Sequence, residues 1–218
     1  MRYFTKDWYK EGQVYGFLTF HSTKEDWEND IQWYNAKGQD YKQVFREELE
    51  YRKNDLMQYL PESFHPYILD GTLKTTFPSD ELRKMAEEWA EEFNQRRIEI
   101  RKEYLQQFNI GKQYLQKDVL QLNEKSLHDA TVNSIELPAK DIVIMNIDGS
   151  GSFHYNTEVK LTFIGVEELL ISEEVEGANW LCHEVYPTNK GFELHVLFNC
   201  PLCEMTIRAE NLLIEELG

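Results

Sequence analysis

Two cysteines two residues apart, Cys200 and Cys203, are the first residues whose types and spacing could do chemistry. The Cys-x-x-Cys spacing is typical of zinc knuckles and of redox-active thiol pairs. Structural zinc requires four ligands, and the dipeptide Cys182-His183 is the nearest further source of a thiolate and an imidazole. If the last strands pair in the simplest register, with Cys200 opposite Cys203, then Cys182 lies about 13 Å from Cys200, too far for one ion. The alternative is that the cysteines are small core residues.

Two histidines, His183 and His195, form a second candidate site. The same simple register places them opposite each other on the more polar face of the predicted sheet. Two imidazoles on neighbouring strands can bind a transition metal such as zinc or titrate as a pair near neutral pH. Glu184 or Glu193 could add a carboxylate ligand. The alternative is a pair of ordinary, partly exposed histidines.

His128 and Asp129 are the third candidate, because a carboxylate can orient a histidine that acts as a general base. Adjacent residues of a strand point to opposite faces, which argues against Asp129 orienting His128. The alternative is structural: Asp129 accepts backbone N–H groups at a turn, and His128 closes the end of the first strand.

Other chemical motifs are missing from the sequence. The Asp-Gly-Ser-Gly-Ser stretch at residues 148–152 lacks the lysine and the following helix of a phosphate-binding loop. The glutamates at residues 87, 88, 91 and 92 lie on the polar face of a predicted helix without the Glu-x-x-His pattern of a di-metal bundle. Neither Gly-x-Ser-x-Gly nor His-Glu-x-x-His occurs. We therefore expect a protein that is not an enzyme and needs no cofactor.

Helical patterns fill the first part of the chain, and these elements must position the candidate residues. Apolar residues three and four apart predict helices over residues 23–37, 40–60 and 80–108, with a short helix near 114–119. Ser22 or Thr23 and Ser79 or Asp80 are suited to cap the N-terminal ends of two of these helices. Residues 13–19 are expected to form a short strand or an irregular packed segment.

The apolar period changes to two after Leu122, as in strands with one buried face. Alternation is clearest over residues 159–163, 192–198 and 203–209, and turn signals separate these runs. The pattern predicts an α+β fold: a mainly α-helical, aromatic-rich domain over residues 1–121, and an acidic antiparallel β domain over residues 122–218. The β domain is expected to be a meander, a sandwich or a small barrel.

Acidic residues dominate the composition. The net charge is −16, and residues 122–218 hold 17 acidic and 5 basic residues. An acidic surface repels phosphate backbones and anionic headgroups, so nucleic acid and membranes are excluded as partners. A basic protein partner or a cation fits better, unless the acidity only aids solubility. Without an apolar run of membrane-spanning length, a signal peptide or a disulfide framework, the sequence predicts a cytoplasmic protein.

Two short segments carry a resemblance to a known family. The opening Met-Arg-Tyr-Phe-Thr-Lys-Asp-Trp-Tyr and the later Leu127-His128-Asp129-Ala130 resemble an uncharacterised family of bacterial proteins, a domain of unknown function found mainly in Bacillus and its relatives. The resemblance implies a bacterial, cytosolic setting and supplies no activity. The His-Asp-Ala stretch also looks like segments of small β domains encoded beside bacterial toxin–immunity genes, an analogy at the level of the fold.

These observations leave two hypotheses for the function. The first is a non-enzymatic, acidic cytosolic protein that binds another, basic protein, in the manner of an immunity protein or an inhibitor. The alternative is a metal-binding protein or an enzyme with a site near His128, His183 and His195, between the helical part and the sheet. In that alternative a transition metal such as zinc is the implied cofactor.

Overall fold

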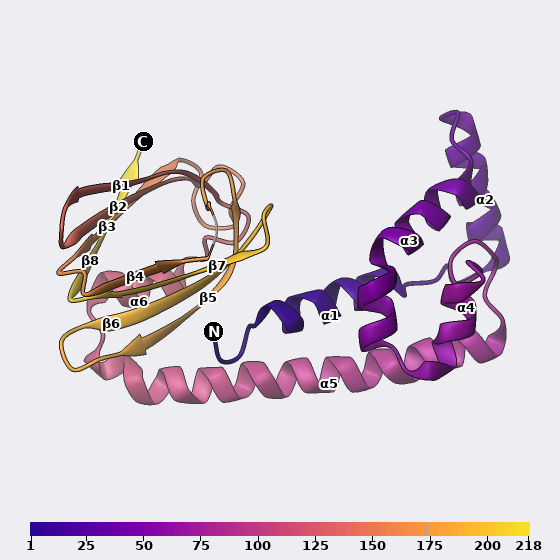
Figure 1. Ribbon diagram of the computed structural model, residues 1–218, viewed down its shortest axis with the longest axis horizontal. Helices are drawn as coiled ribbons and strands as arrows, with labels where there is room; N and C mark the ends of the chain where they lie inside the picture. The colour runs from indigo at the N-terminus through magenta and orange to yellow at the C-terminus, as the bar shows by residue number, and fades with distance from the viewer. Residues whose placement is uncertain (173) are drawn as a thin grey trace. The chain divides into compact units, whose positions relative to one another are not determined.

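The computed structural model describes residues 1–172 and 174–218 (Figure 1). Its contacts divide the chain into two compact units, which we describe separately. The helical unit comprises Asp7–Glu99, and the sheet unit comprises Met1–Lys6 with Ile100–Gly218. The helical unit holds 20 acidic and 12 basic residues and the sheet unit 19 and 11, so each unit carries a net charge of −8. The excess negative charge is therefore shared equally.

Five helices and one short 3-10 turn build the helical unit. They are α1 (Lys6–Phe17), α2 (Lys24–Ala36), α3 (Tyr41–Tyr59), η1 (Glu62–Phe64), α4 (His65–Leu69) and the first part of α5 (Asp80–Gly111). Buried apolar residues on α1, α3 and α5, such as Val14, Leu56 and Phe93, share one core. Helices begin after Thr23, Asp40 and Ser79, which confirms the three longer helices predicted from the sequence.

Local signals explain where these helices begin. Thr23 accepts a hydrogen bond from the Asp26 N–H at 3.0 Å, and Asp40 accepts one from the Lys42 N–H at 2.8 Å. In contrast, the strand or irregular segment expected at residues 13–19 is wrong, because α1 runs to Phe17. Burial of Val14 and Phe17, three residues apart, favours the helix despite the glycines around them.

An eight-stranded antiparallel sheet dominates the sheet unit. Its strands are β1 (Thr131–Ala139), β2 (Ile142–Asp148), β3 (Glu158–Ile164), β4 (Glu168–Ile171), β5 (Asn179–Pro187), β6 (Phe192–Asn199), β7 (Cys203–Ala209) and β8 (Asn211–Leu217). They lie side by side in the order β4-β7-β6-β5-β1-β2-β3-β8. Before them come η2 (Lys112–Tyr114) and α6 (Lys117–Glu124). Helices followed by an antiparallel sheet confirm the α+β fold.

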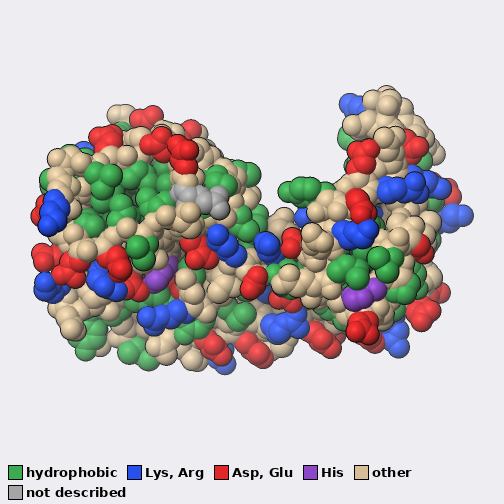
Figure 2. Space-filling model, viewed as in Figure 1, with side chains coloured by type: hydrophobic (Ala, Val, Ile, Leu, Met, Phe, Trp, Pro, Cys, Tyr) green, Lys and Arg blue, Asp and Glu red, His purple; other side chains and the backbone are tan. Residues whose placement is uncertain are grey.

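The sheet curls around its apolar face (Figure 1). Alternate residues such as Leu161, Val196 and Ile207 are fully buried in one core, which also receives Val119 and Leu122 of α6. Figure 2 shows hydrophobic side chains inside the curl and charged side chains around its rim. None of the helices that the structure describes combines the length and the apolarity needed to cross a bilayer.

The register of the last strands differs from the simple one inferred from the sequence. Phe198 pairs with Cys203, so Cys200 lies in the turn between β6 and β7 and does not face Cys203. Between β5 and β6, His183 pairs with Val196, and His195 pairs with Glu184. The expected pairing of His183 with His195 is therefore wrong by one residue, and a one-residue slip moves a side chain to the other face.

Gly191, in the turn between β5 and β6, lies close to the backbone of Ala209 and Glu210 because it has no side chain. A Cβ atom at this position would lie 2.2 Å from the Ala209 carbonyl oxygen and 2.6 Å from the Glu210 Cα. We expect Gly191→Ala to lower the free energy of unfolding by about 1–3 kcal/mol through overpacking. Urea denaturation measures this, and Gly16→Ala, at a helical glycine with open space around it, is the control. That control should leave stability unchanged or raise it by up to about 1 kcal/mol; equal losses in both variants would contradict the explanation.

Candidate functional site

The turn at His128 and Asp129 lies between α6 and β1. Asp129 has a φ of +67°, in the left-handed region that non-glycine residues rarely adopt. Its N–H donates to the Trp180 carbonyl at 2.9 Å, and the Ala130 N–H donates to the Leu127 carbonyl at 2.9 Å. Asp129 therefore belongs to a tight turn that precedes β1.

This turn brings the side chains of His128 and Asp129 together. His128 Nε2 lies 3.6 Å from Asp129 Oδ1, and the two side chains are 41% and 57% exposed. The objection that adjacent strand residues point to opposite faces does not apply, because neither residue lies in a strand. His128 Nδ1 lies 2.5 Å from the Leu181 carbonyl oxygen, and its ring stacks on the exposed Phe153 with centroids 5.8 Å apart.

The Leu181 carbonyl fixes the tautomer of His128. A carbonyl oxygen only accepts, so the hydrogen of this bond resides on Nδ1. In the neutral imidazole, Nε2 then carries a lone pair and lies 3.6 Å from the Asp129 carboxylate oxygen. Two exposed acceptors at this distance can be bridged by a proton, by water or by a bound cation.

The surface of β5, β6, β7 and β4 opposite the apolar core carries the other polar candidates, and we call it the outer face. Its residues form cross-strand rows, since each residue pairs with its neighbour on the next strand. One row is Leu170, Thr206, His195 and Glu184, and the next is Glu168, Arg208, Glu193 and Tyr186. The sequence could not reveal these rows, because they depend on a register that no single strand encodes.

His195 is held by neighbours on both of its ring nitrogens. Nε2 lies 2.7 Å from Glu193 Oε1, and Nδ1 lies 2.9 Å from Thr206 Oγ1. Arg208 bonds the second oxygen of Glu193 and lies 3.3 Å from Glu168. Burial alone would raise the pKa of Glu193, but the bonds from Arg208 and His195 hold it below its usual range. A hydroxyl, an imidazole and a carboxylate meet here, yet the side chains of His195 and Glu193 are only 14% and 15% exposed, so a substrate has little access to them.

Glu184 is the one fully buried carboxylate of the described core. Its oxygens accept the backbone N–H groups of Arg2, Tyr3 and Phe4 at 2.7–2.8 Å and the Tyr186 hydroxyl at 2.7 Å. Burial alone would raise the pKa of Glu184, but these four donors lower it. Glu184 was expected only as a possible metal ligand, and its observed role could not be predicted, because three of its four partners are backbone amides about 180 positions away.

His183 and Cys182 lie away from any charged partner that would make them ligands. The Trp180 indole N–H donates to His183 Nδ1 at 3.2 Å, and burial lowers the pKa of His183 to about 4. Its buried Nε2 makes no well-aligned hydrogen bond among the described residues, although the Leu122 carbonyl lies near enough to favour a proton there. Burial raises the pKa of the Cys182 thiol to about 12, so the thiolate that metals and electrophiles require is scarce.

The two remaining cysteines occupy different environments. Cys200 is exposed in the turn after β6, and Cys203 is buried at the start of β7. Residues 1–172 and 174–218 contain no group of three or more His, Cys, Asp or Glu side chains arranged to hold a metal ion. Structural zinc with four protein ligands therefore has no support in this part of the chain.

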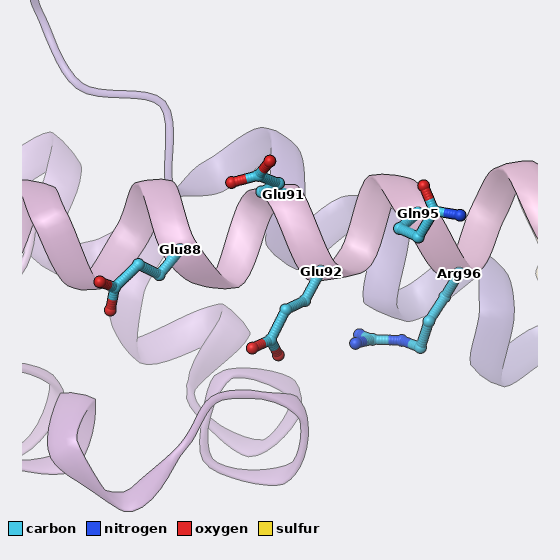
Figure 3. A pocket seen from close by; sticks show the side chains of 5 residues that line it. All are labelled: Glu88, Glu91, Glu92, Gln95 and Arg96. Atoms are coloured by element: carbon cyan, nitrogen blue, oxygen red, sulfur yellow. The ribbon is translucent and has the colours of Figure 1, made fainter.

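A hollow of about 520 Å³ lies on the exposed side of α5 in the helical unit. Its lining is drawn in Figure 3 and consists of Glu88, Glu91, Glu92, Gln95 and Arg96. Arg96 already pairs with Glu11 of α1, and the glutamates project from the helix into solvent. This arrangement is the polar face of an amphipathic helix, as the spacing of the glutamates predicted.

Replacement of Glu184 tests the role of the buried carboxylate. Glu184→Gln should lower the free energy of unfolding at pH 7 by about 2–4 kcal/mol, because an amide cannot accept from all four donors. Since the folded pKa of Glu184 is depressed, its contribution is present above the pKa of an unfolded glutamate and is lost as pH falls below it. Urea denaturation from neutral to acid pH measures both effects. The exposed Glu158→Gln is the control and should change stability by less than about 0.5 kcal/mol.

The buried side chain of His183 should make stability depend on pH at higher pH values than Glu184 does. An unfolded histidine with a pKa near 6.5 binds a proton before His183 does in the folded state, so stability falls as pH drops from about 6.5 toward 4. We expect a loss of about 2 kcal/mol between pH 7 and pH 5 from this group alone. His183→Asn should remove that part of the slope, and the exposed His154→Asn should retain it. Equal slopes in the wild type and His183→Asn would contradict the assignment.

Comparison with known proteins identifies a family and no activity. The family described as Protein of unknown function (DUF4085) matches residues 3–209. No curated protein matches the chain. The match includes the outer face, the His128–Asp129 turn and the helical unit. Because it spans nearly the whole sequence, the chain belongs to this family of proteins of unknown function.

Proposed function

We propose that the protein binds another protein through the β4 and β7 side of the outer face, and that the partner presents basic side chains there. The observation that carries this proposal is the pair of rows in which carboxylates outnumber the one arginine, beside exposed apolar residues at the sheet edge. Leu170 of β4 belongs to the first row and is 57% exposed, whereas the next residue, Ile171, is 38% exposed and points to the other face, where it pairs with Met205. Large apolar side chains rimmed by charge are typical of interaction surfaces.

The charges on this side are already ordered before a partner arrives. Arg208 bonds Glu193 and lies near Glu168, while Glu204 projects from the same face of β7. Two carboxylates, Glu168 and Glu193, thus share one guanidinium, and Glu204 adds a further negative charge on the same face of β7, which leaves a net negative field. A prearranged field of one sign speeds association with a partner of the opposite sign.

The position of β4 supports the same surface. β4 ends the described strand order, so β7 flanks it on one side only. An edge strand presents backbone N–H and C=O groups with which another chain can pair. Exposed apolar side chains, a negative field and an open strand edge therefore coincide at β4.

The arrangement favours binding over catalysis. Thr206, His195 and Glu193 occur in the order of a catalytic triad, but the side chains of His195 and Glu193 are only 14% and 15% exposed, which leaves a substrate little access to them. We place the partner in the cytosol of a bacterium of the Bacillus type, and an immunity or inhibitor role is the form of binding that we propose. This setting rests on the resemblance of the opening residues and of the Leu127–Ala130 stretch to bacterial proteins, and the acidic composition supports a basic partner.

The test compares three forms of the tagged full chain in cells that normally produce it. We expect the wild type to recover one basic protein in stoichiometric amount at low ionic strength, and the double variant Glu168→Lys, Glu204→Lys to recover at least about tenfold less. Glu158→Lys, with the same kind of charge change on β3, is the matched control and should recover as much as the wild type. Equal recovery by all three forms, or no stoichiometric partner, would reject the proposed surface.

A further inference from the structure

The turn at His128 and Asp129 has the features of one half of a metal site. His128 donates its Nδ1 hydrogen to the Leu181 carbonyl, which aims Nε2 at Asp129. Histidines that bind metals usually donate their second ring N–H to a carbonyl or a carboxylate in this way, since the bond fixes both the tautomer and the ring orientation. The free nitrogen of His128 is therefore the one prepared to be a ligand.

The distance between the two side chains fits one ion. Zinc lies about 2.0–2.2 Å from imidazole nitrogen and carboxylate oxygen, so two ligands of a tetrahedral zinc ion stand about 3.4 Å apart. His128 Nε2 and Asp129 Oδ1 are 3.6 Å apart. An ion placed beside both atoms requires only a small movement of either side chain, and it would replace the water that otherwise solvates these two exposed acceptors.

The surrounding loop holds Asp129 in place. The residue keeps its positive φ through the hydrogen bond from its N–H to the Trp180 carbonyl. Gly151 packs against it so closely that a Cβ atom there would lie 3.1 Å from the Asp129 carbonyl oxygen. A carboxylate on a strained and tightly packed turn loses little further freedom when it binds an ion.

We propose that His128 and Asp129 bind a divalent transition metal ion, zinc being the best match to an imidazole and a carboxylate. Because the described residues offer no third ligand nearby, water or a group from a bound molecule completes the coordination. With two protein ligands, two positions of a tetrahedral ion stay open to water or to a bound molecule. This proposal is independent of the partner surface proposed at β4 and β7, because His128 and Asp129 lie in the turn before β1.

The first experiment measures binding of zinc alone to the purified, untagged full chain by calorimetry. We expect one equivalent of zinc to bind, with affinity lowered at least about tenfold in His128→Gln and in Asp129→Asn. Asparagine tolerates the positive φ of this turn, so Asp129→Asn removes the charge and keeps the backbone. His195→Gln, at a histidine whose two nitrogens are already engaged, is the control and should bind zinc like the wild type.

A second measurement locates the ion without any substitution. Cobalt(II) added to the isotopically labelled wild type should shift the NMR signals of Ala130, Phe153 and Leu181 first, because these residues surround the turn. Absence of zinc binding, unchanged affinity in both turn variants, or cobalt shifts centred on Cys200 or His195 would overturn the proposal. In the first case the His128–Asp129 pair is an ion pair of an imidazolium and a carboxylate only.

Discussion

The buried carboxylate of Glu184 is the interaction on which the arrangement of the sheet unit depends. Removing an ionised carboxylate from water costs several kcal/mol, and only donors aimed at both oxygens offset that cost. Here the donors are three successive backbone N–H groups at the start of the chain and one tyrosine hydroxyl. The first residues are thereby fixed to β5, where the Arg2 guanidinium lies 4.3 Å from the Tyr186 ring and Phe4 packs on Tyr104. One ionic group thus joins segments that the chain separates by a whole compact unit.

The bulge in β5 decides which side chains of this strand face the core and which face outward. Between Trp180 and Cys182 the register shifts by one residue, so that His183 faces the core and Glu184 faces outward. Without that shift His183 and Glu184 would exchange faces. The same local feature therefore buries one histidine as a neutral core residue and supplies the carboxylate that captures the N-terminal segment.

The elements could be predicted from the sequence wherever the apolar residues keep one period. The prediction is wrong where a single residue departs from that period. The long apolar stripes of α3 and α5 and the alternation of β3, β6 and β7 were enough to predict the elements and the α+β class. The pairing of His183 with Val196 could not be predicted, and the expected pairing with His195 is wrong, because the bulge leaves no mark in the apolar pattern. The contact of His128 with Asp129 depends on one positive φ, and an aspartate in that conformation looks like any aspartate before a strand.

Three histidines of the sheet unit, His128, His183 and His195, illustrate how burial and partners decide a role. His183 is enclosed and neutral, and both nitrogens of His195 have partners, so each is already committed to the structure. His128 differs in its surroundings, since one nitrogen bonds a carbonyl and the other lies 3.6 Å from an exposed carboxylate. A cation can bind between that nitrogen and that carboxylate without breaking a hydrogen bond within the chain. Of these three residues, His128 is therefore the one whose bonding within the chain leaves room for a ligand from outside it.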